Sequence, residues 1–310
     1  MPEALGVIVF LGCFLRIRQR WFIEGMPGFG FTTWVAQTTI DGTAIAPDQY
    51  RALMPWADHL LAIAGQLPLP TAILVSDFGL LVVVLVLLHL LEARLGQPGV
   101  LLAAATGWAY WTAKLDHWDP QVMLLTAVVT AVSLLLHDER SHDGLALALG
   151  LITCGARADY AVGLGIVVLG VGVHRRRRRT ALTGLALIMA AVAATFVLAD
   201  VLYPKARYDV AIVQLPFNLT PGVWAMVLTF YGALLITPAL LAARSRSAPP
   251  MAFTIAWFLV EFAATFVVGR VEESRIFMPF APVLGVAALL AYQHLSGRSS
   301  VAITREPACP

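Results

Sequence analysis

Long apolar stretches separated by short polar links constrain this chain more than any other feature. The segments 70–91, 180–203 and 250–269 each provide roughly the 20 mainly apolar residues that a helix needs to cross a lipid bilayer. Only 13% of the 310 residues are charged, whereas a soluble globular domain carries about 25%. Because so few charges cannot cover a water-facing surface, we expect an all-α polytopic membrane protein, with residues 1–310 forming a single integral membrane domain.

The prediction comprises about ten membrane segments, some of them short or re-entrant. A single helix over 144–173 would be about 45 Å long, against a hydrocarbon core of about 30 Å. It would also hold Arg157 and Asp159 at mid-bilayer, where a charge costs at least about 2.5 kcal/mol on insertion scales. We therefore predict two short helices in this region. The segments besides the three above are 4–15, 98–113, 120–136, 144–156, 160–173, 221–243 and 276–293.

The orientation of the chain follows from five consecutive arginines, Arg175–Arg179. Lysine and arginine are in excess in the cytoplasmic loops of membrane proteins. We therefore expect this loop and the tail 294–310 in the cytoplasm, and a multi-pass protein of the bacterial cell (inner) membrane. With 144–173 split in two, the long loop 16–69 is extracytoplasmic. A single helix there would reverse the sidedness of that loop, and the arginines of loop 16–69 favour the reversed version.

Loop 16–69 contains one patterned stretch. Asp48 is a residue type that caps helices, and after it apolar residues recur at steps of three and four. A helix of this kind beside a membrane is typical of one that lies in the interface plane, although packing against the bundle explains the pattern equally well. Pro55 predicts a kink or a break. The apolar positions are Tyr50, Leu53, Met54, Ala57, Leu60, Leu61 and Ala64.

Four polar clusters fall on the outer face in this topology. Carboxylates can remove a proton from an acceptor hydroxyl, and arginines hold phosphate through bidentate, charge-assisted bonds. Solvated turns, a helix cap and ordinary ion pairs are the alternative explanations. The clusters are Asp41, Asp48, Gln49, Tyr50 and Arg51; Lys114, Asp116, His117, Trp118 and Asp119; Arg157 and Asp159; and Arg270, Glu272, Glu273 and Arg275.

Other functional classes leave little trace in the sequence. The net charge of +2 gives no reason to expect a nucleic-acid partner. Cys13, Cys154 and Cys309 have no disulfide or metal-binding spacing, and no nucleotide-binding or metalloprotease motif is present. We expect membrane lipids as partners and infer no cofactor. Protein partners and the need for a divalent metal are left open.

Three stretches of the chain carry a resemblance to a known family. An acid in the first outer loop precedes a Tyr-Arg…Pro-Trp segment, an arginine separates two short helices, and a late Glu-x-Arg precedes two prolines. The stretches are Asp41–Gly42 with Gln49–Trp56, Arg157, and Glu273–Arg275 with Pro279 and Pro282. Together they resemble the C-type (GT-C-like) polytopic membrane glycosyltransferases, nearest a poorly characterised bacterial branch of that superfamily.

The resemblance implies a cell-envelope enzyme of the hexosyltransferase type. It would move a sugar from a polyprenyl-phosphate-linked donor to an acceptor on the outer face of the membrane. Asp41 would be the catalytic base, with Asp48 as the second candidate. Two departures stand out: Asp41 lacks the adjacent second acid of many members, and Arg157 is followed by Ala-Asp instead of Glu-Thr. The donor phosphate would contact Arg157, Arg275 and Arg51, supported by Tyr50, Asp119, Asp159 and Glu273.

Two other functions are consistent with the same residues. A transporter or flippase of a lipid-linked or sugar intermediate would use these arginines for phosphate. It would need a coupling acid, and Asp77 and Glu261 lie within apolar segments, where charges are functional candidates. A non-catalytic membrane scaffold would need none of these residues. The acids that matter for function therefore discriminate among the three hypotheses.

Overall fold

The computed structural model describes residues 2–23, 27–44, 48–112, 121–135, 143–206, 213–228, 249–268 and 276–296. Within these ranges every element of regular secondary structure is a helix, which confirms the all-α prediction. A backbone that lies in lipid has to pair its own N–H and C=O groups, and a helix does so within a single segment.

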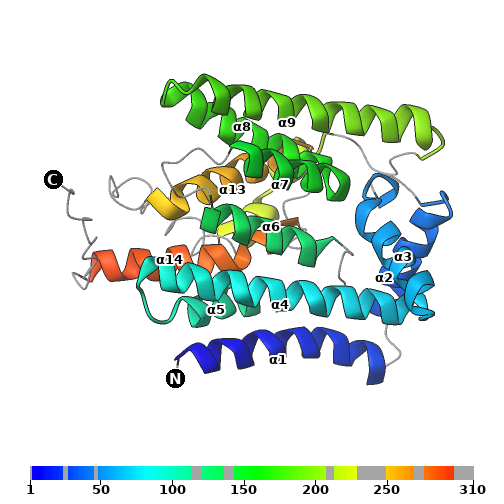
Figure 1. The fold of residues 1–310 in the computed structure, drawn as a ribbon, viewed down its shortest axis with the longest axis horizontal. Coiled ribbons are helices and arrows are strands. Elements are labelled where there is room, and N and C mark those ends of the chain that lie inside the picture. Colours follow the sequence, from blue (N-terminus) through cyan, green and yellow to red (C-terminus); the bar gives the residue numbers. More distant parts are fainter. Residues whose placement is uncertain are drawn as a thin grey trace.

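The helices form one bundle with several shorter elements at its sides (Figure 1). In chain order they are α1 (Pro2–Ile23), α2 (Pro27–Ile40), η1 (Asp48–Tyr50), α3 (Leu53–Gly65), α4 (Leu69–Leu95), α5 (Val100–Thr112), α6 (Val122–Leu135), α7 (Asp143–Ala156), α8 (Ala158–His174), α9 (Arg178–Phe196), the π-helix η2 (Val197–Leu202), α10 (Leu215–Asn218), α11 (Pro221–Met226), α13 (Pro249–Val268), η5 (Met278–Phe280) and α14 (Ala281–Leu295).

Three helical stretches of the described chain are long and apolar enough to cross a membrane: Leu69–Leu95, Arg178–Leu202 and Met251–Val268. These three stretches support a membrane protein by length and composition. The number of about ten membrane segments stays a prediction, because the other apolar helices are shorter. These include Pro2–Leu15, Val122–Leu135, Asp143–Ala156, Ala158–His174 and Met278–Gln293.

The prediction that 144–173 forms two helices is confirmed. α7 and α8 are separated by Arg157, whose backbone is extended, with φ −157° and ψ 104°. Ala158 and Asp159, which were predicted to lie in the turn, belong instead to the first turn of α8. An extended residue interrupts the helical hydrogen-bond pattern, so the chain can change direction at this point.

α7 folds back alongside α8 instead of continuing its direction. A Cβ atom at Gly150 of α7 would touch Leu187 of α9, and Cys154 packs with Ala161 and Ala191. α8 and α9 are themselves antiparallel neighbours. α7 and α8 therefore form a hairpin whose turn is Arg157, and α9 packs along both of its arms.

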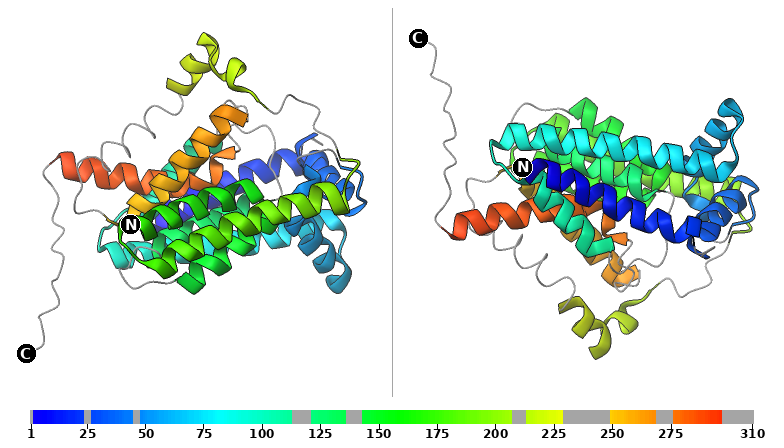
Figure 2. Two further views of the ribbon diagram at one scale, coloured as in Figure 1. Left: turned by 90° about the horizontal axis from the view of Figure 1, so that it is seen from above. Right: turned by 90° about the horizontal axis from the view of Figure 1, so that it is seen from below.

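The long helices run between two ends of the molecule (Figure 1). One end carries the α4–α5 and α8–α9 connections, with exposed arginines at Arg175–Arg179. The other end carries α2 and α3. The Arg157 turn belongs to this second end, because Leu53, the first residue of α3, packs against Gly155. Figure 2 shows that α13 and α14 cross obliquely to the long helices α4, α8 and α9.

Much of the segment 16–69, predicted as an extracytoplasmic loop with one helix after Asp48, is helical. α1 continues to Ile23, and α2 and α3 occupy most of the remainder. Asp48 does not cap α3, whose N-cap is Ala52 and has no side-chain cap bond; Asp48 begins η1 instead. Pro55 produces no break because it lies in the first turn of α3, where a backbone N–H has no helical partner in any case.

α3 turns much of its predicted apolar face away from the bundle. Leu53, Ala57, Leu60 and Ala64 of that face are exposed and Met54 is buried. Asp58, which is not on that face, is also buried. The Asp58 carboxylate accepts a hydrogen bond from Ser76 of α4 at 2.5 Å. A polar contact at this end of the bundle therefore helps to anchor α3 on α4, and the apolar surface is left facing outward.

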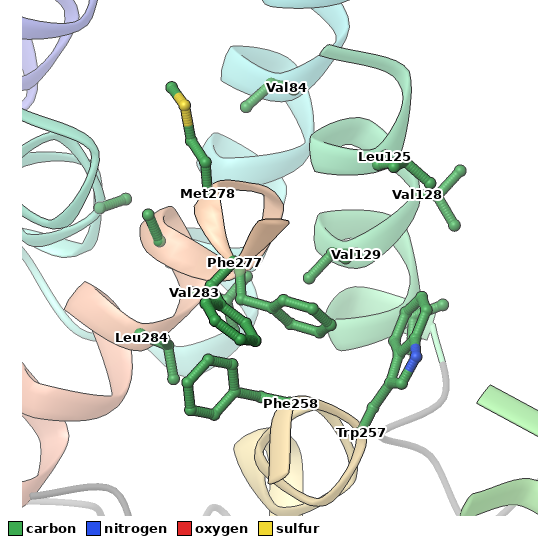
Figure 3. Close-up of a cluster of buried hydrophobic side chains, with 14 of the residues drawn as sticks. Val84, Leu125, Val128, Val129, Trp257, Phe258, Phe277, Met278, Val283 and Leu284 are labelled. Carbon is green, nitrogen blue, oxygen red and sulfur yellow. The ribbon is translucent and has the colours of Figure 1, made fainter. Parts of the chain in front are cut away.

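The core between α4, α6, α13 and α14 is rich in aromatic side chains (Figure 3). Phe258 and Phe277 meet edge to face with ring centroids 5.7 Å apart, and Trp257 and Phe280 do so at 5.3 Å. Edge-to-face pairs contribute about 0.5–1.5 kcal/mol beyond the burial of their area. This packing fixes the segment that begins at Ile276 against α13.

Close contact between α8 and α9 requires glycine at position 165, and we therefore predict the effect of replacing it. A Cβ there would lie 2.9 Å from the carbonyl oxygen of Gly184 and 2.8 Å from Ile188. We expect Gly165→Ala to destabilise the protein by about 1–3 kcal/mol through overpacking, measured as thermal unfolding of the purified protein in detergent.

Gly170→Ala is the matched control because Gly170 lies on the same helix and a Cβ there would meet nothing within 4 Å. The control should unfold at the same or a higher temperature, since alanine favours the helix by about 1 kcal/mol. Equal unfolding temperatures for the two variants would contradict the close packing of α8 on α9.

Candidate functional site

Arg157 lies at the centre of a polar cluster at the α2–α3 end of the bundle. Its side chain is only 7% exposed. Nε donates a hydrogen bond to Oδ1 of Asp159 at 3.1 Å, and Nη2 donates to Oδ2. A guanidinium has five N–H donors in a planar fork, and this pair uses two of them. The Asp159 side chain is 54% exposed, so the ion pair connects a buried cation with the surface.

The guanidinium of Arg157 lies over the ring of Tyr160. The guanidinium carbon lies 4.7 Å from the centroid of the ring, within the range of a cation–π interaction. The ring also stacks on Phe280, with the ring centroids 5.5 Å apart. Tyr160 itself is fully buried. A buried ring held by Phe280 restricts where the guanidinium can lie.

Tyr160 also connects three elements through hydrogen bonds. Its hydroxyl donates to the backbone carbonyl of Ile276, and its own carbonyl accepts from Nε1 of Trp257 at 3.1 Å. The N-terminus of α8 is thereby joined to α13 and to the segment that leads into η5. Ile276 directly follows Arg275 in the sequence.

Glu261 supplies a second, deeply buried carboxylate behind this network. It is 2% exposed, and its Oε1 accepts a hydrogen bond from Nε1 of Trp257 at 3.2 Å. It packs against Gly163 of α8, where any side chain would displace it. Through Trp257, which also bonds the Tyr160 carbonyl, Glu261 is connected to the start of α8.

Asp48 and Arg51 bring the first polar cluster to the Arg157 turn. Nη1 of Arg51 lies 3.2 Å from Oδ1 of Asp48, and both side chains are mostly buried. The positive charge of Arg51 acts on Asp159 and on Tyr160. The backbone carbonyl of Arg51 accepts a hydrogen bond from Nε2 of Gln121 at 2.9 Å, which joins the segment to the start of α6.

Asp41 lies at the same end of the molecule, at its surface. It follows the last residue of α2, is exposed, and accepts hydrogen bonds from Nε2 of Gln37 at 3.0 and 3.1 Å. Gly42 after it has a φ of 71°, which favours glycine, and lies against the ring of Tyr203. The carboxylate is therefore oriented by Gln37 and remains open to solvent.

Tyr50 contacts the segment that follows η2. Its hydroxyl donates to the backbone carbonyl of Ala206 at 3.0 Å. Burial, reinforced by the negative charge of Asp200, raises the pKa of Tyr50 above its ordinary value. The phenol therefore stays protonated at neutral pH and acts as a hydrogen-bond donor, which fits the supporting role predicted for it.

The structure brings together four of the predicted site residues, namely Asp48, Arg51, Arg157 and Asp159. Asp41 and Tyr50 lie at the same end of the bundle, beside residues 203–206. Asp119, Glu273 and Arg275 fall outside the described residues. The sequence analysis missed Gln121, Tyr160 and Trp257. The position of Tyr160, one residue after Asp159 at the start of a helix, was the available signal.

We predict that the Tyr160 hydroxyl contributes to the stability of the folded protein. Tyr160→Phe keeps the ring under Arg157 and removes the bond to the Ile276 carbonyl, leaving a buried acceptor unpaired. We expect a loss of about 1–3 kcal/mol, measured by thermal unfolding in detergent.

Tyr292→Phe provides the comparison, because Tyr292 is 61% exposed on α14. This variant should unfold at the wild-type temperature. A Tyr160→Phe protein as stable as Tyr292→Phe would show that the hydroxyl does not hold the two segments together.

Comparisons with known proteins do not place this cluster in a family. No family model matches the chain, and no curated protein or solved structure matches it either. A function for the site therefore has to be argued from its own geometry and chemistry.

Proposed function

We propose that the chain is a membrane glycosyltransferase that moves a sugar from a polyprenyl-phosphate-linked donor to an acceptor on the outer face of the bacterial cell membrane. One observation carries the proposal: the described parts of the stretches that resemble the C-type enzymes lie together in space. Leu53, from the first stretch, packs against Gly155 beside Arg157, and Tyr160 bonds Ile276, three residues before Pro279. These stretches are far apart in the sequence.

The proposed topology has about ten membrane segments, with the Arg175–Arg179 loop and the C-terminus in the cytoplasm. The positive-inside rule supports this orientation. The Arg157 cluster lies at the opposite end of the bundle from Arg175–Arg179, and so it belongs to the outer face. The hairpin at Arg157 supports the same orientation. Two helices over 144–173, in place of one, add one membrane crossing, and this crossing puts loop 16–69 on the outer side.

Arg51 and Arg157 are the proposed ligands of the donor phosphate, together with Arg275. Arginine suits this role because it stays charged and binds phosphate oxygens in pairs. Asp159 occupies one edge of the Arg157 guanidinium, as a carboxylate that a phosphate group can replace. Asp48 holds Arg51 in position through their ion pair.

The reaction needs one base and one leaving group. Asp41, exposed and oriented by Gln37, accepts the proton of the acceptor hydroxyl. The hydroxyl oxygen then attacks the anomeric carbon of the sugar. The bond from that carbon to the phosphate oxygen breaks, and polyprenyl phosphate leaves with the electron pair. The arginines stabilise the charge that develops on the phosphate.

The sidedness of the cluster is the first prediction of this proposal. Single cysteines are introduced by Thr43→Cys and by His174→Cys, in a background where Cys13, Cys154 and Cys309 are replaced. Both positions are exposed, at opposite ends of the bundle. In intact cells, a membrane-impermeant thiol reagent should label the first variant, and the second only after permeabilisation. The reverse pattern would place the cluster in the cytoplasm and contradict a reaction on the outer face.

Substitution of individual acidic residues distinguishes an enzyme from a transporter, because the two functions depend on different carboxylates. Sugar transfer is measured with purified protein, polyprenyl-phosphate hexoses and a membrane extract as the source of acceptor. Asp41→Asn should lower the rate by at least about 100-fold, the usual effect of losing a general base. Asp48→Asn should act mainly on the KM for the donor, because it releases Arg51.

Asp77→Asn and Glu261→Gln are the controls, since both acids are buried and neither is assigned to the reaction. They should retain transfer activity. Loss of function with these two variants, combined with tolerance of Asp41→Asn and Asp48→Asn, would favour the transporter. Tolerance of all four changes would leave a membrane scaffold.

A further inference from the structure

Gln121 presents a buried hydrogen-bond acceptor beside the proposed phosphate site. The residue is 1% exposed, and its Nε2 donates to the backbone carbonyl of Arg51 at 2.9 Å. Within the part of the chain that the structure describes, its Oε1 has no hydrogen-bond partner. This bond joins the start of α6 to the Asp48–Arg51 segment, so the Gln121 amide lies beside the backbone of Arg51.

The amide of Gln121 cannot be turned around to satisfy that oxygen. The Arg51 carbonyl only accepts hydrogen bonds, so it requires the NH2 group of Gln121 to face it. A flipped amide would place two acceptors against one another and leave two donors unpaired. The oxygen therefore points away from Arg51 in the only arrangement that keeps the bond at 2.9 Å.

A buried acceptor without a hydrogen bond destabilises the protein, and only a ligand group that donates a hydrogen bond can remove this destabilisation. Leaving such a group without a partner costs about 1–3 kcal/mol. An oxygen acceptor repels phosphate and carboxylate, so its partner has to be a donor such as a hydroxyl. The neighbouring Arg51 cation attracts the opposite chemistry, an anion. A hydroxyl and a phosphate side by side is the chemical signature of a sugar joined to phosphate.

We propose that Oε1 of Gln121 accepts a hydrogen bond from a hydroxyl of the donor sugar. The inference rests on the proposed function and adds to it a residue that distinguishes a glycosylated lipid phosphate from the bare lipid phosphate. A site built to bond a hydroxyl rejects a ligand that lacks it, because the polar group is then left unpaired.

The test compares two ligands on one protein. Wild type, Gln121→Leu and Gln121→Met are reconstituted in lipid nanodiscs, and binding of polyprenyl phosphate is measured beside polyprenyl phosphate carrying glucose, galactose or mannose. Wild type should bind the best of the sugar-bearing lipids more tightly than the bare lipid. Both variants should lose about five- to tenfold in affinity for that ligand, as expected for one neutral hydrogen bond, and should bind the bare lipid within about twofold of wild type.

Gln293→Leu on α14 is the matched control and should bind both ligands as wild type does. Gln121→Met keeps the length of the side chain, so a folded variant is obtained even if leucine is not tolerated. An equal loss for both ligands, or no loss for either, would overturn the role of Gln121 while leaving the lipid-phosphate site intact. Failure of wild type to bind any of these lipids would overturn the proposed function and this inference together.

Discussion

A guanidinium keeps its proton at any ordinary pH, so a chain that buries one has to surround it with compensating groups. At Arg157 these groups come from both sides of the cation. Asp159 pairs with it toward the surface, and the Tyr160 ring lies beneath it. The Tyr160 carbonyl accepts a hydrogen bond from Trp257, so the residue beneath this cation also contacts α13. The hairpin, the aromatic core and the polar end of the bundle meet here.

The same residue explains why the chain reverses direction. A continuous helix over this region would carry the cation into the middle of the apolar segment, where it has no water and few partners. An extended backbone at Arg157 instead brings the charge to the end of the bundle, beside Arg51 and the start of α6. The break in secondary structure and the polar cluster are therefore two results of a single constraint.

Much of this was predictable from the sequence, for physical reasons. Long apolar runs require helices in lipid, and the cost of a mid-bilayer charge predicted the break at Arg157. Within 16–69 the helix after Asp48 was predicted from its apolar spacing and is α3, whereas α2 was not predicted. The burial of Asp58 on α3 was not predicted either, because it depends on the contact with Ser76 of α4. Gln121 and Tyr160 were missed because their roles depend on backbone carbonyls of distant residues, Arg51 and Ile276, and sequence spacing does not encode such contacts.

The shortness of α7 has a consequence for how a substrate reaches this site. A helix of 14 residues is about 21 Å long, less than the hydrocarbon thickness of about 30 Å. If α7 starts near the inner surface, as in the proposed topology, the Arg157 turn lies below the outer surface, at the depth of the upper lipid chains. A lipid-linked donor would then enter sideways from the leaflet in which its tail is already anchored. Diffusion in two dimensions, and not capture from water, would supply the site.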